Sequence, residues 1–283
     1  MLDNTDLQER WPSGLRQLPA KQLYCNRYRG FESRPLRMIY ILLPSYNEAL
    51  GIQELLSTID SRMRLLGLVY QAVVVDDGSS DDTYSRATAM RGLCSLEVIR
   101  HDKNRGLGEA LKTGLDHIIS KANDEDIMVI MDADNTHPPD LIGTMNETIN
   151  NGSDIVIASR YQKGAKVIGV PSYRRMLSRG ASFLFSSFIS VPNVKDYTGG
   201  YRAYRVGLLR DAFKFYNGNL VTEKGFSCMV DILLKLNKLK PEITEVPLTL
   251  NYYKKRGPSK MKIAKSIKTT FGILFTNIWR KNS

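Results

Sequence analysis

Two carboxylates one residue apart, Asp132 and Asp134, follow an apolar run and are the residues of this chain best suited to do chemistry. On an extended strand, side chains at positions i and i+2 point to the same face, so the two carboxylates are expected to converge. Carboxylates this close repel each other, and one takes up a proton unless a cation lies beside or between them. Mg²⁺ and Mn²⁺ choose such oxygen ligands and share them with substrate phosphates. The pair therefore predicts a divalent metal that holds a diphosphate.

Two further polar clusters follow apolar runs that are predicted to be buried strands. They are Ser45-Tyr46-Asn47-Glu48 and Asp76-Asp77-Gly78-Ser79. In open α/β sheets, ligands bind beyond the carboxyl ends of the strands. One such cluster is often only a turn or a helix cap, but three clusters at one edge indicate a binding site. The sequence has neither a P-loop nor a G-x-G-x-x-G after its first strand, which argues against a P-loop NTPase and against a dinucleotide site.

The periodicity of the chain indicates how these clusters are positioned. Up to residue 159, short apolar runs alternate with amphipathic stretches, which is the pattern of βαβ units and of a mainly parallel sheet flanked by helices. Strands are expected at 38–44, 71–77, 95–101, 126–132 and 154–159, and helices at 49–66, at 106–119 and after Pro138-Pro139. Beyond residue 160 we expect an amphipathic segment, a strand, a helix and a strand at 173–191, 201–207, 226–239 and 245–250. We therefore divide the domain, 38–262, into a nucleotide half, 38–159, and an acceptor half, 160–262, which are expected to form one unit.

The positive charge of the chain is concentrated at its end. Of the net charge of +11 over 283 residues, residues 251–283 supply +9, because they contain nine Lys and Arg and no acid. Residues 263–283 are expected to form a basic amphipathic helical tail for an anionic membrane surface, or else a core helix whose lysines face water. The three cysteines lack metal-binding spacing, so we expect reduced packing residues in a cytosolic protein. No apolar run approaches the ~20 residues of a membrane span.

The first 37 residues show neither helical nor strand periodicity. The sequence GFES, residues 30–33, is what a bacterial-type tRNA T-arm encodes in one reading frame, and WPSGLRQLPAK, residues 11–21, also resembles translated tRNA. We therefore expect residues 1–37 to be a non-native extension, with Met38 as the true start, or else a disordered leader.

Seven motifs in the remaining chain occur together in one known family. They are LLPSYNE (42–48), VVVDDGSSDDT (73–83), DADNTHPP (132–139), ASRY (158–161), RRMLSRGAS (174–182), DYTGGYRAYR (196–205) and RGPSKMK (256–262). On these motifs the sequence, over about residues 38–261, resembles family 2 glycosyltransferases of the GT-A fold, in the dolichol-phosphate mannose synthase and polyprenyl-phosphate glycosyltransferase branch. The resemblance implies an α/β, Rossmann-like sheet and an inverting transfer that depends on Mg²⁺ or Mn²⁺. The donor would be GDP-mannose or a UDP-hexose, and the acceptor a polyprenyl or dolichyl phosphate.

The resemblance also assigns roles to individual residues. The nucleotide would be bound by Pro44, Tyr46, Glu48, Asp76, Asp77 and Asp132. The metal and the donor diphosphate would be bound by Asp132 and Asp134, with Thr136 where some relatives have a Gln ligand. The acceptor phosphate would be held by Arg160, Arg174, Ser178 and Lys254, the last at a position where the family usually has Arg. Asp196 would contact the sugar, and the expected catalytic set is Asp132, Asp134, Arg160 and Lys254.

The residue types also bear on the acceptor. A phosphomonoester needs no general base, because its second pKa is about 6 and it is already ionised, whereas a hydroxyl acceptor does need one. None of the three histidines occupies a convincing base position, and His137, before Pro-Pro, is expected to hydrogen-bond within its own turn. A saccharide or protein hydroxyl acceptor is the alternative, with Asp196 or Asp231 as the base.

Other classes of protein explain less of the sequence. A nucleic-acid-binding module would account for the basic tail but not for the three acidic strand ends, so no nucleic acid partner is expected. A transferase that has lost its activity and serves as a scaffold is disfavoured, because the Asp132/Asp134 pair and the Arg160/Arg174/Ser178 set are intact. A processive polysaccharide synthase is disfavoured because Q-x-x-R-W is absent. A lipid acceptor implies that the protein lies peripherally at the cytoplasmic membrane face. It would bind there either directly or through a membrane-protein partner.

Overall fold

The continuous apolar runs of the sequence form the centre of a mainly parallel sheet. The computed structural model describes residues 37–171, 176, 179–180 and 191–257. Seven strands lie in the order β3-β2-β1-β4-β7-β5-β8, and β7 is antiparallel to both of its neighbours. Their bounds are β1 Ile39–Ser45, β2 Tyr70–Asp76, β3 Leu96–Arg100, β4 Ile127–Ile130, β5 Ile155–Ser159, β7 Arg202–Arg205 and β8 Ile243–Pro247. The predicted sheet class is confirmed.

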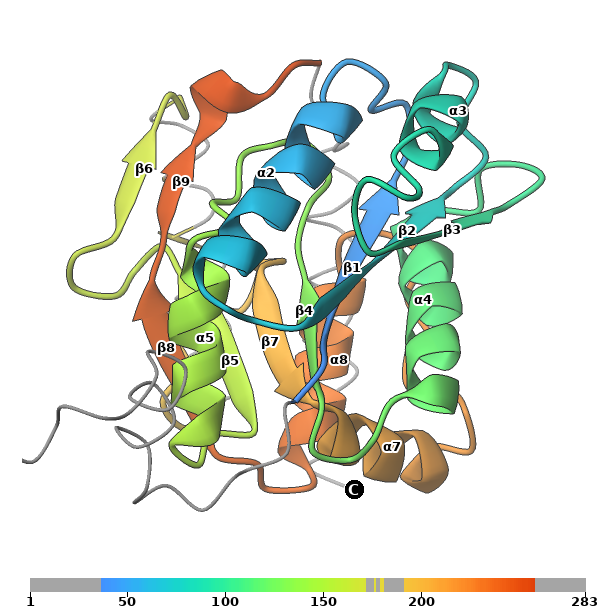
Figure 1. Cartoon of the computed structure of the whole chain (residues 1–283). Helices are drawn as coiled ribbons and strands as arrows, with labels where there is room; N and C mark the ends of the chain where they lie inside the picture. The colour runs from blue at the N-terminus through green and yellow to red at the C-terminus, as the bar shows by residue number, and fades with distance from the viewer. Residues whose placement is uncertain (1–36, 172–175, 177–178, 181–190, 258–283) are drawn as a thin grey trace, which may run out of the picture. The chain divides into compact units, whose positions relative to one another are not determined.

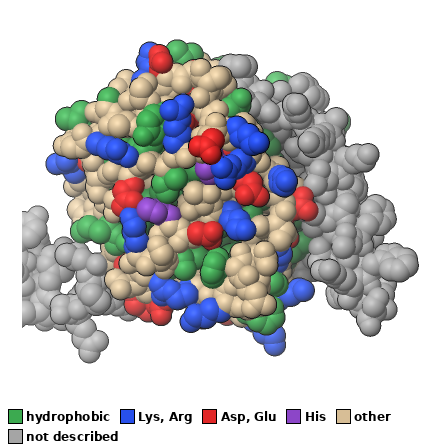
Figure 2. Space-filling model, turned by 90° about the vertical axis from the view of Figure 1, so that its right-hand side faces the viewer, with side chains coloured by type: hydrophobic (Ala, Val, Ile, Leu, Met, Phe, Trp, Pro, Cys, Tyr) green, Lys and Arg blue, Asp and Glu red, His purple; other side chains and the backbone are tan. Residues whose placement is uncertain are grey.

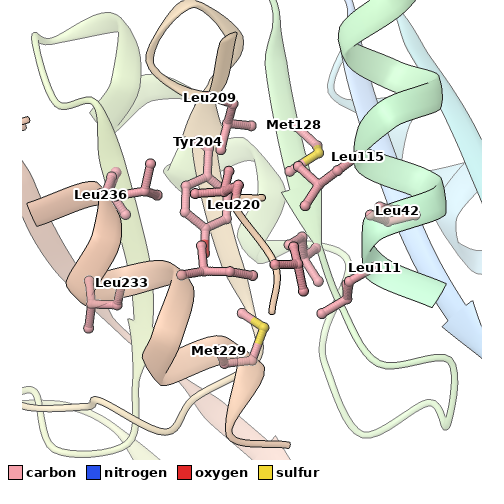
Figure 3. Close-up of a cluster of buried hydrophobic side chains, with 14 of the residues drawn as sticks. Leu42, Leu111, Leu115, Met128, Tyr204, Leu209, Leu220, Met229, Leu233 and Leu236 are labelled. Carbon is pink, nitrogen blue, oxygen red and sulfur yellow. The ribbon is translucent and has the colours of Figure 1, made fainter. Parts of the chain in front are cut away.

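Helices cover both faces of this sheet (Figure 1). Their bounds are α2 Ile52–Leu65, α3 Thr83–Thr88, α4 Leu107–Lys121, α5 Leu141–Asn150, α7 Val206–Phe215 and α8 Cys228–Asn237. Because side chains alternate along a strand, Ile41 and Leu43 enter the apolar cluster beneath α2, α3 and α5, whereas Leu42 enters the cluster beneath α4, α7 and α8. Figure 3 shows the second cluster, with Leu42 and Met128 from the sheet beside Leu111 and Leu115 of α4. Two buried layers thus hold the strand ends in place.

A second, two-stranded sheet stands at the margin of the main one (Figure 1). Strand β6, Lys166–Ile168, pairs in parallel with β9, Thr249–Asn251, and a short 3₁₀ turn, η1 Tyr252–Lys254, follows β9. We refer to residues 161–171 and 249–257 together as the β6–β9 ribbon.

All the strands and helices that were expected in the nucleotide half are present, with ends that differ by a few residues. Strand β4 ends at Ile130, not at residue 132, and α5 begins at Leu141, because residues 138 and 139 form the turn that leads into it. Helix α7 and strand β6 were not predicted. Strand β7, from the acceptor half, lies between β4 and β5 of the nucleotide half, so both halves share one sheet. No helix in the described ranges is long and apolar enough to cross a bilayer.

Some expectations concern residues outside the described ranges. They are the leader up to residue 36, most of the amphipathic segment 173–191, and the tail 263–283.

Candidate active site

The ends of β1, β2 and β4 meet at one edge of the sheet, as the sequence predicts. These three strands are adjacent and parallel, and Ser45 at the end of β1 is in register with Asp76 at the end of β2. The loops beyond them are also tied together. The backbone N–H of Asn47 donates to Ser79 Oγ (2.9 Å), and that of Glu48 donates to Thr83 Oγ1 (2.7 Å). Pro44, Tyr46 and Glu48 are half-buried along this edge.

The two aspartates of the DAD motif lie just beyond β4. Ala133 is buried in the core, whereas 41% of the Asp132 side chain is exposed, so the alternation expected of a strand persists past its end. Asn135 then turns the chain with a φ of 64°, in the left-handed region that Asn tolerates. Its Nδ2 donates to the carbonyl oxygen of Gly51 (3.0 Å), which fixes this turn against the start of α2. The motif is therefore held in a defined turn that leaves both carboxylates at the sheet edge.

Asp134 is paired with a cation from a distant part of the chain. The Nζ atom of Lys255 lies 2.5 Å from Asp134 Oδ2, and each of these side chains is 12% exposed. Thr136 donates to Asp134 Oδ1 from its hydroxyl (2.6 Å) and from its backbone N–H (3.1 Å). Burial alone would raise the pKa of Asp134, but Lys255, His137 and the hydrogen bonds outweigh it, and the pKa is lowered. Asp134 is thus held as a carboxylate.

Asp132 has a different environment. The backbone N–H of Asp132 donates to His137 Nδ1 (3.1 Å), and the His137 ring stacks on Tyr201 with its centroid 4.8 Å away. Because Nδ1 accepts this hydrogen bond, the ring nitrogen that can donate is Nε2, which lies 3.9 Å from Asp132 Oδ2. The expected turn hydrogen bond of His137 is confirmed. The surrounding protein, which leaves this side chain only partly open to solvent, and the nearby charge of Asp134 raise the pKa of Asp132, despite His137 and Lys255.

These donors suit a hard divalent cation. When the pKa values of two neighbouring carboxylates are shifted apart, a cation beside them stabilises both charged forms. Among the residues that the structure describes, no three His, Cys, Asp or Glu side chains are placed so that they could hold a metal ion by themselves. A metal held by Asp132 and Asp134 would therefore complete its coordination with substrate oxygens and water, as Mg²⁺ and Mn²⁺ do. The Thr136 hydroxyl donates its proton to Asp134 Oδ1, and this hydrogen bond orients the carboxylate.

The two aspartates at the end of β2 have separate tasks. Asp77 Oδ1 accepts from His101 Nδ1 (2.7 Å) and from the Arg105 backbone N–H (2.9 Å), and Oδ2 accepts from the Gly106 N–H (2.8 Å). This buried carboxylate anchors the loop that enters α4, and the geometry does not favour the expected nucleotide contact. Asp76 is different, because its buried Oδ2 accepts no hydrogen bond in the described part of the chain. It lies 3.4 Å from Arg100 Nε.

Arg160 and Asp196 form a buried pair next to Asp132. Arg160 donates to Asp196 from Nε (2.8 Å) and Nη2 (2.6 Å), and Nη2 also reaches Thr198 Oγ1 (2.8 Å). A Cβ at Gly200, in the same loop, would lie 3.4 Å from Asp132 Oδ1. Asp196 is fully buried, so its carboxylate orients Arg160 and is not open to the sugar contact expected from the sequence.

The side chains of the three basic residues at 254–256 point in three different directions. Lys254 is exposed, Lys255 turns inward to Asp134, and Arg256 pairs with Glu54 of α2 (3.2 Å). Sequence reasoning chose Lys254 by its motif position, and the adjacent lysines gave no signal to separate them. Of the four residues expected at the acceptor phosphate, the structure therefore places Arg160, beside Asp132, and Lys254, exposed to solvent, whereas Arg174 and Ser178 lie outside the described residues.

Comparisons with known proteins agree with this fold and these motifs. The family model described as Glycosyl transferase family 2 matches residues 40–213. A dolichol-phosphate mannosyltransferase from Pyrococcus furiosus is 37% identical over 79% of this chain, which spans only 59% of that protein's length. A polyprenol monophosphomannose synthase from Mycolicibacterium smegmatis is 30% identical over 81% of this chain and 82% of its own length.

A solved structure shares the fold at lower identity. It is a glucosyl-3-phosphoglycerate synthase from Mycobacterium tuberculosis, crystallised with Mn²⁺, uridine diphosphate and phosphoglyceric acid. It superposes with a TM-score of 0.64 and 21% identity, over 86% of this chain and 78% of that one. This chain therefore shares the overall fold of that synthase. The chain belongs to glycosyl transferase family 2.

Proposed function

We propose that this protein transfers a hexosyl group, with mannose as the first choice, from a nucleoside diphosphate sugar to a polyprenyl phosphate, using Mg²⁺ or Mn²⁺. The observation that carries the proposal is the Asp132–Asp134 turn at the edge of β1, β2 and β4, with Arg160 one loop away. The named activities of the relatives, mannosyl transfer to dolichol or polyprenol phosphate, support it.

The donor would lie across the ends of β1 and β2, with its diphosphate at the DAD turn. Asp76 Oδ2, which accepts no hydrogen bond among the described residues, and the half-buried Tyr46 and Glu48 suit contacts to the base and ribose. A metal bound by Asp132 and Asp134 would neutralise the leaving diphosphate. The acceptor oxygen would attack the anomeric carbon from the opposite side, and the glycosidic bond to the diphosphate would break as the new bond forms.

The acceptor is expected to be a phosphate because neither of the two carboxylates considered as a base, Asp196 and Asp231, is free in the part of the chain that the structure describes. Asp196 is committed to Arg160, and Asp231 accepts from Thr222 Oγ1 (2.8 Å) and Lys235 Nζ (2.9 Å). A phosphomonoester is already ionised at neutral pH and requires no such base. Arg160 supplies a fixed positive charge beside the site, since Asp196 and its hydrogen bonds outweigh burial and raise the pKa of the guanidinium.

Contact with an anionic membrane surface is supported by the β6–β9 ribbon. This ribbon contains no acid, and three of its five Lys and Arg residues, Lys163, Lys166 and Lys254, are exposed, as is Tyr253 at 77%. The other two are Lys255, which turns inward to Asp134, and Arg256, which pairs with Glu54. By contrast, Figure 2 shows the face over α3, β3 and α4, where acidic and basic side chains are interspersed. A basic surface with an exposed aromatic side chain suits anionic lipid headgroups. We propose a peripheral position at the cytoplasmic membrane face.

The direct test is transfer of radiolabelled sugar by the purified protein. GDP-mannose, UDP-glucose and UDP-N-acetylglucosamine are each supplied with Mn²⁺ or Mg²⁺ and undecaprenyl phosphate, and lipid-extractable label is counted. We expect label in the lipid phase with one donor, and none with EDTA. Label found only on added saccharide or protein acceptors would replace this proposal by the hydroxyl-acceptor alternative.

A further inference from the structure

The ammonium group of Lys255 lies where a metal ion bound to Asp134 would place its positive charge. Its ammonium group is 2.5 Å from Asp134 Oδ2, and both side chains are largely withdrawn from solvent. Glu48 adds a second negative charge near Lys255, and the Tyr252 ring centroid lies 5.7 Å from its Nζ. A full positive charge is therefore already seated at the DAD turn.

The backbone that carries Lys255 is fixed on both sides. Before it, β9 pairs with β6, and Asn251 Oδ1 accepts from the Tyr253 backbone N–H (3.1 Å). After it, Arg256 pairs with Glu54 on α2. The backbone of Lys255 is thus held beside the DAD turn, so an ammonium group displaced from Asp134 remains within reach of the site.

A divalent cation and an ammonium group compete for the same carboxylate. A metal that binds alone would displace Lys255 from Asp134 and leave two like charges close together in a poorly solvated place. A metal that arrives with a nucleoside diphosphate brings its own anion. The phosphate oxygens then receive the displaced ammonium group, and the like-charge cost is removed.

We propose that Lys255 makes metal binding at Asp134 conditional on the nucleoside diphosphate, so that the two bind as one unit. This inference rests on the proposed metal and donor site and adds the coupling between its two ligands. By linkage, the nucleotide must raise the affinity for the metal by the same factor as the metal raises the affinity for the nucleotide. Removing Lys255 should therefore have opposite effects on free metal and on nucleotide.

The test measures Mn²⁺ binding by electron paramagnetic resonance, without nucleotide and with saturating GDP or UDP. In the wild type, we expect the better of the two nucleotides to raise Mn²⁺ affinity by about a hundredfold, near the upper end of usual coupling factors. In Lys255→Met, free Mn²⁺ should bind about tenfold more tightly and the nucleotide about tenfold more weakly, so the coupling factor shrinks. Lys255→Arg, which keeps the charge, should keep the wild-type coupling.

Lys214→Met is the matched control, because it removes the same charge from an exposed position on α7, at the other end of the sheet (Figure 1). It should leave both affinities unchanged. The inference is overturned if Lys255→Met, folded by circular dichroism, binds free Mn²⁺ no more tightly than the wild type. If the wild type binds no Mn²⁺ even with GDP or UDP, the metal site itself fails, and the proposed function fails with it.

Discussion

The guanidinium of Arg160 faces the carboxylate of Asp196 side-on, with hydrogen bonds of 2.8 and 2.6 Å between residues 36 apart in sequence. The Asp196 side chain is fully buried and that of Arg160 is 21% exposed. The same carboxylate accepts from the backbone N–H groups of Arg160 (3.0 Å) and Gly199 (2.9 Å). This pair joins the end of β5 to the Gly199–Gly200 loop beside Asp132, so it should control both stability and the placement of Arg160.

Asp196→Asn should lower the free energy of unfolding by about 3 kcal/mol, because it leaves a buried guanidinium without its counter-charge. Chemical denaturation at pH 7 measures this. Asp140→Asn is a suitable control, since Asp140 forms an ion pair with Arg62 in which both side chains are exposed, and it should cost under about 1 kcal/mol. Equal costs for the two changes would contradict the structural role of Asp196.

The same pair predicts a pH dependence. Burial raises the pKa of Asp196, but Arg160 outweighs burial, and the pKa lies below its ordinary value. A carboxylate whose pKa is lowered in the folded state stabilises the fold at pH values above its unfolded pKa of about 3.9. This stabilisation is lost as the pH falls through the folded pKa. The stability difference between wild type and Asp196→Asn should therefore be constant from pH 7 to about 5 and shrink below pH ~4. A difference that instead grows on acidification would exclude this origin.

Helix α4 begins in close contact with the loop that precedes α8. A Cβ on Gly108 would overlap the carbonyl oxygen of Glu223, whereas a Cβ on Gly143 of α5 would lie 3.1 Å from Cδ1 of the half-exposed Leu66, which can move. Gly108→Ala should therefore destabilise by about 1–3 kcal/mol. Gly143→Ala should be neutral or stabilise by up to about 1 kcal/mol, because Ala favours a helix. Thermal unfolding of both variants tests this difference in sign.

The sequence predicted those parts of the fold that depend on local pattern. Apolar runs and amphipathic stretches located the strands and helices up to residue 159, and the polar residues after three strands indicated the correct edge of the sheet. Helix α7 also had a signal, because Val206, Leu209 and Ala212 recur at helical spacing. It was missed because the expected strand was extended to residue 207, past the true end of β7 at Arg205.

What the sequence did not predict depends on contacts between distant residues. The insertion of β7 between β4 and β5 is a matter of topology, and nothing near Arg160 indicates that Asp196 takes its guanidinium. The choice of Lys255 over Lys254 is made by the 3₁₀ turn Tyr252–Lys254, which aims successive side chains in different directions. A run of three basic residues does not encode that choice locally.

Asp134→Asn should reduce sugar transfer by at least about a hundredfold, because the loss of one charged ligand weakens metal and diphosphate binding in the transition state. Lys255 loses its partner as well, so stability should fall measurably. Asp140→Asn, the same chemical change at an exposed site, should keep full activity. The metal role is wrong if Asp134→Asn turns over like the wild type, or if excess EDTA has no effect on the wild type.

Mutations can separate the contributions of the β6–β9 ribbon and of the tail to membrane binding. Lys163→Glu with Lys166→Glu reverses two charges on the ribbon, and deletion of residues 263–283 removes the tail. Each change should reduce sedimentation with vesicles that contain phosphatidylglycerol, because anionic lipid attracts basic residues by about 1 kcal/mol each. Lys214→Glu with Lys238→Glu makes the same change on α7 and beyond α8, and should not. If only the tail deletion reduces binding, the ribbon is not a membrane contact.

Arg174→Ala tests the acceptor site. Arg174 and Ser178 are four residues apart and would share a face if helical, and Arg160 at the end of β5 would complete the clamp for the lipid phosphate. Because Asp196 holds Nε and Nη2 of Arg160, that guanidinium can contribute its charge and its remaining edge, and Arg174 should supply most of the direct hydrogen bonds. Arg174→Ala should therefore raise the KM for undecaprenyl phosphate by about tenfold or more, which corresponds to losing one charged hydrogen bond.

Nucleotide binding provides the control for this prediction. Arg174→Ala should bind GDP or UDP with Mn²⁺ as tightly as the wild type, since the donor is expected at the ends of β1 and β2. Steady-state kinetics with the acceptor varied, together with calorimetric titration of the nucleotide, separate the two effects. Loss of nucleotide binding would place Arg174 in the donor half of the site. Unchanged transfer to the lipid phosphate would remove the clamp and leave the hydroxyl-acceptor alternative as the better account of this enzyme.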